Sequence, residues 1–184
     1  GIHYVLDHLV MPILEEFKPD IIINSAGQDN HYSDPLANMA FSAQGYARLN
    51  ETLAPDIAVL EGGYSVESAL PYINMGIIMA MAGIDYSNLR EPDYKPGRLK
   101  EPASNMERIY KIVDTQLSTF RRREEVIEKN RRSGQMFKTS HESIFYDTDY
   151  ISESQRNELR LCPSCGGFRI INSSARHPNG REYN

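Results

Sequence analysis

An aspartate in the amino-terminal part of the sequence has the setting of a metal ligand. Asp34 lies in a polar, glycine-containing loop after the β-branched run at 20–24, and that run predicts a buried strand. Pro35 disfavours the α region for Asp34, so extended backbone presents its carboxylate. Because ligands bind beyond the carboxyl ends of strands in α/β sheets, we expect Asp34 to bind a metal ion. The alternative is an Asp-Pro turn that only caps the loop.

A tyrosine occupies an equivalent place after a second predicted strand. The apolar residues 57–60 run into Gly62, Gly63 and Tyr64. A tyrosine that follows two glycines is usually a packing residue, and its phenol hydroxyl is also a hydrogen-bond donor. If both loops follow parallel strands, they meet at one edge of the sheet, and Asp34 and Tyr64 can act on a common atom.

Three stretches of the sequence carry a resemblance to a known family. They read FKPDIIINSAGQDNHYSDPLANM at 17–39, GYARL at 45–49 and VLEGGYSVES at 59–68. In this order and spacing they resemble the histone deacetylase family in its broad sense, which includes acetoin-utilisation proteins and acetylpolyamine amidohydrolases. The similarity covers residues 1–84 and corresponds to the carboxyl-terminal part of the deacetylase catalytic domain.

The resemblance implies roles for four residues. Asp34 corresponds to the family's second metal-binding aspartate, and Tyr64 to the tyrosine that hydrogen-bonds the carbonyl oxygen of the substrate. Gly62 and Gly63 correspond to glycines along the channel for the acyl-lysine side chain. The implied reaction is hydrolysis of an acetyl-amide bond in acetylated lysine, an acetylated polyamine or a small metabolite. Zn²⁺ would polarise the carbonyl and activate water, and carboxylate-rich ligation leaves Fe²⁺ as an alternative.

The chain departs from the family in its histidines. Two adjacent histidines and an Asp-x-His pair supply the family's other metal ligands and its general base, and both motifs precede the matched region. No two of the five histidines here are adjacent: they are His3, His8, His31, His141 and His177. We therefore expect an incomplete catalytic domain that is inactive without a missing amino-terminal half. His31, in the Asp34 loop, is expected to face solvent or the rim of the channel.

A cysteine pair near the carboxyl end suggests a second, structural zinc site. Cys162 and Cys165 form a Cys-x-x-Cys motif followed by two glycines. This is typical of half a zinc ribbon, which needs further ligands from absent sequence or a partner. An unmetallated turn and a redox pair are the alternatives. Two other functions therefore stay open: a non-catalytic deacetylase-like subunit, and a zinc-ribbon interaction module on a deacetylase remnant.

The predicted elements explain how the two loops come together. Helical periodicity covers residues 3–17, where Pro12 bends or restarts the helix, and again residues 66–82. Ser42 is a candidate cap for a helix that ends near Leu53. These helices alternate with the two strands, which predicts an α/β fold with a parallel sheet flanked by helices on both faces. The resemblance makes this a partial arginase/deacetylase-like domain.

Composition changes along the chain and divides it into four predicted segments. Prolines and few aliphatic residues mark a linker, and a capping box at Ser104 opens a long amphipathic helix. A short strand at 144–146 is the one regular element expected in the polar tail. The segments are the α/β domain at 1–84, the linker at 85–103, the amphipathic helix at 104–133 and the polar extension at 134–184.

Charge and hydropathy exclude several classes of partner. The formal net charge of −5 offers no basic surface for nucleic acid or an anionic membrane. No apolar run reaches the ~18 residues of a membrane span, and no basic leader precedes an apolar core, so we expect a cytoplasmic protein. Because only part of the sheet is expected in this chain, we also expect an exposed sheet edge and poor solubility.

Overall fold

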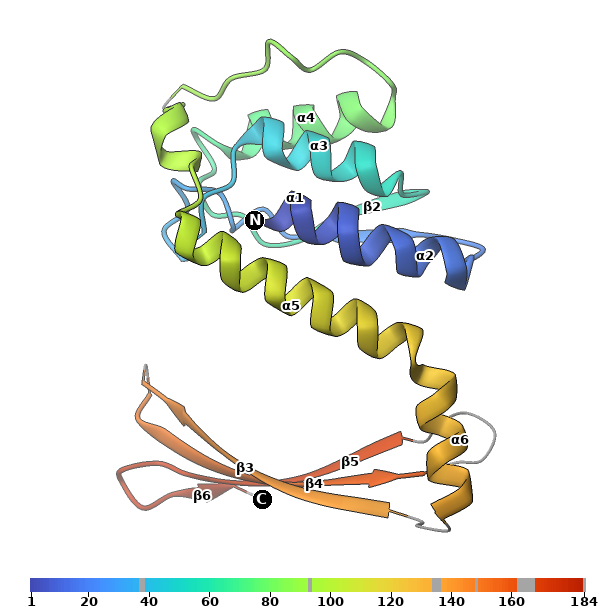
Figure 1. Cartoon of the computed structure of the whole chain (residues 1–184). Helices are drawn as coiled ribbons and strands as arrows, with labels where there is room; N and C mark the ends of the chain where they lie inside the picture. The colour runs from blue at the N-terminus through green and yellow to red at the C-terminus, as the bar shows by residue number, and fades with distance from the viewer. Residues whose placement is uncertain (37–38, 93, 134–136, 148, 162–167, 184) are drawn as a thin grey trace. The chain divides into compact units, whose positions relative to one another are not determined.

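The computed structural model describes residues 1–184 except 37–38, 93, 134–136, 148, 162–167 and 184. The chain divides into two compact units, Gly1–Leu117 and Ser118–Asn184 (Figure 1). The first unit contains both predicted site loops. Cys162 and Cys165 lie outside the described residues, so the half zinc ribbon stays a prediction.

A helix interrupted by a π-helical turn begins the first unit. It comprises α1 (Ile2–Val5), the π-helical turn η1 (Leu6–Val10) and α2 (Met11–Phe17). Pro12 has no backbone N–H and therefore cannot make the regular i→i−4 hydrogen bond to His8. The backbone widens into the π turn just before this proline. The bend predicted at Pro12 therefore takes the form of a local change of helix type.

The two predicted strands pair in parallel. β1 (Ile23–Ala26) and β2 (Ile57–Leu60) lie side by side with Ile23 opposite Ile57. The predicted parallel pairing is confirmed. Since parallel strands end at the same edge of a sheet, the loop that carries Asp34 and the loop that carries Tyr64 both start from that edge.

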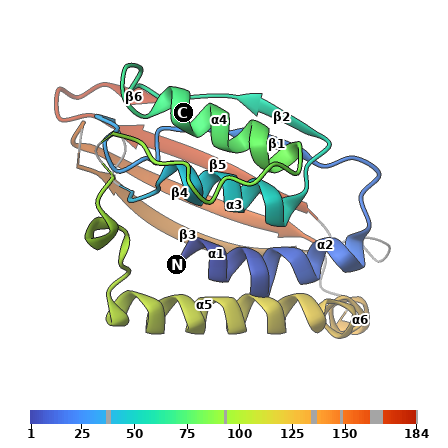
Figure 2. The ribbon, with the colours of Figure 1, turned by 90° about the horizontal axis from the view of Figure 1, so that it is seen from above.

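Helices α3 (Ala43–Leu53) and α4 (Leu70–Met81) cover one face of this sheet (Figure 2). Ser42 caps α3 as predicted, because its hydroxyl oxygen accepts a hydrogen bond from the Gly45 amide at 3.1 Å. The core forms where the two helices meet β1. Its buried members are Ala26, Ala43, Tyr46, Ala69, Ile73 and Ile77.

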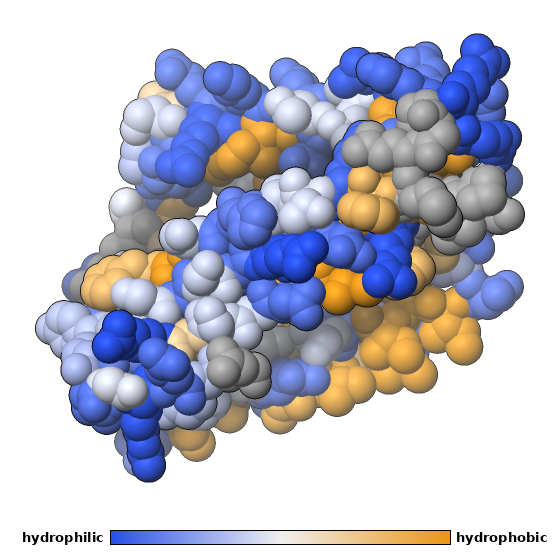
Figure 3. Space-filling model, turned by 90° about the horizontal axis from the view of Figure 1, so that it is seen from below, coloured by the Kyte–Doolittle hydropathy of each residue, from blue (hydrophilic) through white to orange (hydrophobic). Residues whose placement is uncertain are grey.

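The opposite face of the sheet is open in the described part of the chain. Ile23, Ile57 and Val59 are 61%, 48% and 45% exposed. The prediction of buried strands is therefore wrong for this chain, because the described helices pack on one side of only two strands. Apolar side chains at the surface appear as orange areas in Figure 3. Poor solubility stays a prediction.

The segment predicted as a linker contains one short 3₁₀-helix, η2 (Pro96–Leu99). The long helix that follows, α5 (Ala103–Arg121), begins one residue before Ser104. Ser104 thus lies inside the first turn, and the predicted capping box does not open this helix. No described helix is both long and apolar enough to cross a membrane. A cytoplasmic location stays a prediction.

The predicted single helix to residue 133 is broken at Arg122 and continues as α6 (Arg123–Ser133). The side chain of Arg123 donates a hydrogen bond to the carbonyl oxygen of Phe120 at 3.0 Å and lies over the Phe120 ring. This contact satisfies one of the carbonyl groups that the last turn of a helix leaves without a helical partner. It stabilises the carboxyl end of α5.

The second unit carries a four-stranded antiparallel sheet in the order β3-β4-β5-β6 (Figure 1). The strands are β3 (Phe137–Tyr146), β4 (Ile151–Arg160), β5 (Phe168–Arg176) and β6 (Glu182–Tyr183). The sequence predicted only a short strand at 144–146 in this region. The polar extension therefore has far more regular structure than expected, and Cys162 and Cys165 lie between β4 and β5 in the sequence.

Candidate active site

Asp34 and Tyr64 meet beyond the carboxyl ends of the two parallel strands. The Tyr64 amide donates a hydrogen bond to Oδ2 of Asp34 at 2.7 Å, although the two residues are 30 positions apart. The other carboxylate oxygen, Oδ1, accepts a hydrogen bond from the Leu36 amide at 2.9 Å. Asp34 is buried, with 9% of its surface exposed. Its carboxylate therefore joins the first loop to the second.

The loop of Tyr64 depends on its two glycines. Gly63 has φ +149°, and a Cβ there would lie 3.0 Å from atoms of Gln28 and Leu70. A Cβ on Gly62 would lie 3.0 Å from the Asp29 carboxylate. Gly63 thus requires glycine through its backbone conformation and its close packing, whereas a Cβ on Gly62 would require the Asp29 carboxylate to shift. Their place along a substrate channel stays a prediction.

The side chain of Tyr64 remains accessible while its backbone is fixed. Tyr64 is 52% exposed, and its amide is held by Asp34. A phenol that is open to solvent on a fixed backbone is available to donate to a ligand. The catalytic role of its hydroxyl stays a prediction, and so does the metal role of Asp34.

The described residues do not complete a metal site by themselves. Among them, no group of three or more His, Cys, Asp or Glu side chains is placed to hold one ion. A catalytic zinc takes three protein ligands and keeps an open position. Asp34 on its own does not make up such a set among the described residues.

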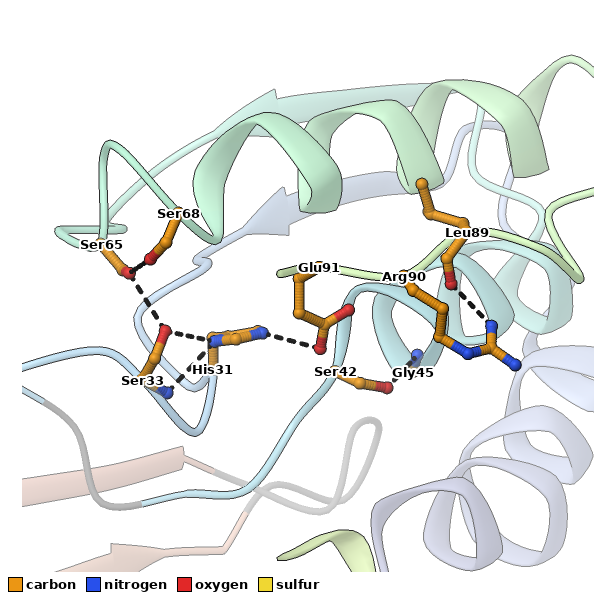
Figure 4. A network of polar contacts seen from close by, with 9 residues as sticks. All are labelled: His31, Ser33, Ser42, Gly45, Ser65, Ser68, Leu89, Arg90 and Glu91. Carbon is orange, nitrogen blue, oxygen red and sulfur yellow. Dashed lines mark hydrogen bonds and ion pairs between the residues drawn. The ribbon is translucent and has the colours of Figure 1, made fainter. Parts of the chain in front are cut away.

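The structure corrects the prediction for His31. This residue is 1% exposed and faces neither solvent nor a channel rim. Its Nε2 lies 3.1 Å from Oε1 of Glu91, and its Nδ1 lies 2.9 Å from the Ser33 hydroxyl (Figure 4). The Ser33 hydroxyl is also 3.0 Å from the Ser65 hydroxyl, which in turn is 2.8 Å from that of Ser68. His31 is thus the centre of a polar network that runs beneath both loops.

Sequence reasoning missed Glu91, Ser33 and Ser65. Glu91 is 3% exposed and lies in the segment predicted to be an unstructured linker. The residue types gave one general signal, because a glutamate and a histidine each need a polar partner once they are buried, but nothing in the sequence marked these two as buried. Their pairing across 60 positions has no periodic pattern that would reveal it.

Opposing effects act on the pKa of Glu91. Burial favours the neutral acid and would raise the pKa, but hydrogen bonds, first of all from His31, together hold it below its usual value of 4.5. The carboxylate is therefore ionised in the folded protein at neutral pH. A buried carboxylate that is paired in this way contributes to the pH dependence of folding.

Replacing Glu91 with glutamine is expected to make the first unit less sensitive to acid. The folded pKa of Glu91 lies below its unfolded value, so the unfolded state takes up the proton first as pH falls. The stabilisation that Glu91 gives the folded state is complete at pH values above its pKa in the unfolded state. It is lost as pH falls through the lower pKa of Glu91 in the folded state. Urea unfolding from about pH 6 to 3, followed by circular dichroism, should show a smaller fall in unfolding free energy for Glu91→Gln.

The matched control for this measurement is Glu67→Gln, which removes an exposed carboxylate of the same unit. Its unfolding free energy should fall with pH as steeply as that of the wild type. If Glu91→Gln follows the wild-type curve as well, the pairing of Glu91 with His31 does not stabilise the folded state.

The chain is similar to known deacetylases. A family model described as "Histone deacetylase domain" matches residues 1–77. A "Probable deacetylase" from Archaeoglobus fulgidus is 49% identical over 102 residues, which is 50% of this chain and 28% of that protein. A "Probable deacetylase" from Methanothermobacter thermautotrophicus is 34% identical over 108 residues, 56% of this chain and 31% of that protein.

Two further proteins are similar to part of the chain. A "Histone deacetylase-like amidohydrolase" from Pseudomonas aeruginosa is 26% identical over 122 residues, 54% of this chain and 32% of that protein. A solved structure titled "Crystal Structure of HDA15 HD domain" has a TM-score of 0.41 and 30% identity over 44% of this chain and 24% of that chain. A TM-score at this level does not define a shared fold.

The amino-terminal part of the chain belongs to the histone deacetylase superfamily. The chain spans 28–32% of the length of the deacetylase relatives named above. The family model ends at residue 77, so Glu91 lies beyond the matched segment while its partner His31 lies within it.

Proposed function

We propose that this chain supplies part of the active site of a metal-dependent deacetylase that hydrolyses acetyl-amide bonds. The observation that carries the proposal is the hydrogen bond from the Tyr64 amide to the Asp34 carboxylate. It joins two loops at the carboxyl edge of a parallel sheet, within a segment of the histone deacetylase superfamily. The substrate class is acetylated lysine, an acetylated polyamine or a small acetyl-amide.

Asp34 is proposed to be an anionic oxygen ligand for Zn²⁺, with Fe²⁺ as the alternative. Such an ion would polarise the acetyl carbonyl and make water a better nucleophile. Because the described residues provide no complete set of ligands, the other ligands and a general base are proposed to come from an amino-terminal half of the catalytic domain. The proposed site is therefore complete only when that amino-terminal half is present.

Tyr64 is proposed to bind the substrate through its hydroxyl. The hydroxyl donates a hydrogen bond to the acetyl carbonyl oxygen, where negative charge develops during hydrolysis. Its backbone is held by Asp34, so a metal ligand and a hydrogen-bond donor are positioned by one contact. Gly62 and Gly63 are proposed to line the channel for the acyl-lysine side chain, next to the loop that they allow to lie against Gln28, Leu70 and Asp29.

The test is an assay of the full-length protein with an acetyl-lysine peptide and with an N-acetylated diamine. We expect release of acetate from at least one substrate, loss of this activity after treatment with a chelator, and its return with Zn²⁺ or Fe²⁺. An activity that survives complete removal of metal would contradict the metal-dependent mechanism. Absence of hydrolysis from metal-loaded full-length protein would contradict the proposed function.

A further inference from the structure

The hydrogen bonds around His31 determine which of its ring nitrogens carries the proton. The backbone amide of Ser33 donates to Nδ1 at 3.2 Å. Since an amide N–H can only donate, Nδ1 must hold a lone pair, and the ring proton is on Nε2. Nε2 faces Oε1 of Glu91 at 3.1 Å. The ionised Glu91 carboxylate therefore sets the tautomer and the orientation of the His31 ring.

His31 is linked by hydrogen bonds to both site loops, through Ser33 and Ser65. Ser33 contacts Nδ1 through its hydroxyl, and the same hydroxyl bonds to that of Ser65 (Figure 4). Ser33 directly precedes Asp34, and Ser65 directly follows Tyr64. Two cross-links thus join the loops at neighbouring positions: the amide-to-carboxylate bond and the serine–serine bond.

The segment that carries Glu91 is anchored to the fold at other points. Leu89 packs against the core formed by α3 and α4. Gln44 of α3 donates hydrogen bonds to the carbonyl oxygens of Tyr86 and Ser87 at 3.3 and 2.7 Å. Glu91 therefore extends from a segment that is fixed independently of His31, so its carboxylate can hold the His31 ring in one orientation.

We propose that Glu91 is a positioning residue for the deacetylase site, acting through His31, Ser33 and Ser65 on the loops of Asp34 and Tyr64. This inference rests on the proposed function, and it adds to the site a residue beyond the matched family segment. Residues that orient ligands from outside the coordination sphere typically change metal affinity or activity by about 10–100-fold when they are replaced.

The first test measures turnover in the full-length protein with the acetyl-lysine peptide. Ser33→Ala and Glu91→Gln should each lower kcat by about 10–100-fold and leave KM within about twofold, because the loops lose alignment while substrate contacts remain. Ser87→Ala is the matched control, since Ser87 lies on the same segment and its hydroxyl, the group that the substitution removes, donates to the Asp85 carboxylate and not to the His31 network. Its kcat should equal that of the wild type.

The second test does not depend on activity. Hydrogen exchange of the Tyr64 amide should be about 2- to 10-fold faster in Ser33→Ala and Glu91→Gln, the effect of weakening one hydrogen bond. The Ile22 amide donates to the Asp56 carboxylate before the two strands begin, and its exchange should not change. Nitrogen NMR of His31 in the wild type should show the proton on Nε2.

The outcomes separate the two proposals. If the wild-type protein hydrolyses no acetyl-amide, the proposed function fails, and the exchange rate of Tyr64 decides the positioning role. If the wild type is active and both variants keep its kcat and its Tyr64 exchange rate, the positioning role is overturned and the deacetylase function stands. A proton on Nδ1 of His31 also overturns the positioning role. Should Glu91→Gln fail to fold, Ser33→Ala decides, because it leaves the His31–Glu91 pair intact.

Discussion

Replacing Tyr64 with phenylalanine is expected to lower kcat of the full-length protein about 10²–10³-fold, equivalent to the loss of about 2.7–4 kcal/mol of transition-state stabilisation. The hydroxyl would donate to an oxygen whose negative charge grows during the reaction, so its effect falls on kcat more than on KM. The substitution keeps the backbone amide that binds Asp34, and the loop geometry is therefore preserved. Steady-state kinetics with the acetyl-lysine peptide measure both parameters.

Tyr183→Phe is a matched control for this change. Tyr183 is 53% exposed, against 52% for Tyr64, and it lies on β6 in the second unit. Removing its hydroxyl should leave kcat and KM at wild-type values. A Tyr64→Phe protein whose kcat stays within about twofold of the wild type would show that this hydroxyl does not stabilise a developing oxyanion.

Elements with a local chemical signal were predictable from the sequence. Ser42 was identified as the cap of α3 because a hydroxyl before an amphipathic stretch satisfies a free amide, and its bond to Gly45 has this form. The strand at 57–60 was recognised from its apolar residues and has the predicted bounds. Parallel pairing followed from the helix between the two strands.

The environment of His31 was not predictable in the same way. Its burial depends on Glu91, 60 positions later, in a segment whose prolines indicated a free linker. A pattern within a short window contains no information on such a pair, because the contact is produced by packing of the whole unit. The tautomer and the serine bonds depend on that packing as well.

The sheet of the second unit was missed for a different reason. A half-buried strand is recognised from apolar residues at every second position. In β4 both alternating sets consist mainly of polar residues, from Ser152 and Glu153 to Arg160, so this signal is missing. The side chains of Tyr146 and Ser173 both donate to the Glu153 carboxylate across the sheet. Polar side-chain pairs between neighbouring strands, such as these, contribute to the stability of the sheet.

Replacing Asp34 with asparagine is expected to remove the catalytic metal and to lower turnover by more than about 100-fold, beyond the range typical of residues outside the coordination sphere. The amide has no negative charge to offer an ion. It also has a single oxygen, so its NH₂ group would face either the Leu36 or the Tyr64 amide, which both now donate to the carboxylate. Elemental analysis of the purified full-length protein measures the metal directly.

Asp56→Asn provides a closely matched control. Asp56 also accepts a backbone amide hydrogen bond across the strand pair, from Ile22 at 2.8 Å, but it precedes β2. Both substitutions weaken an amide-to-carboxylate bond between the segments of β1 and β2, so both should lower the unfolding free energy, by about 1 kcal/mol for the exposed Asp56 and by about 1–3 kcal/mol for the buried Asp34. Only Asp34→Asn should lose metal and turnover. Full metal content in Asp34→Asn together with its loss in Cys162→Ser would assign the ion to the cysteine pair and remove Asp34 from the metal site.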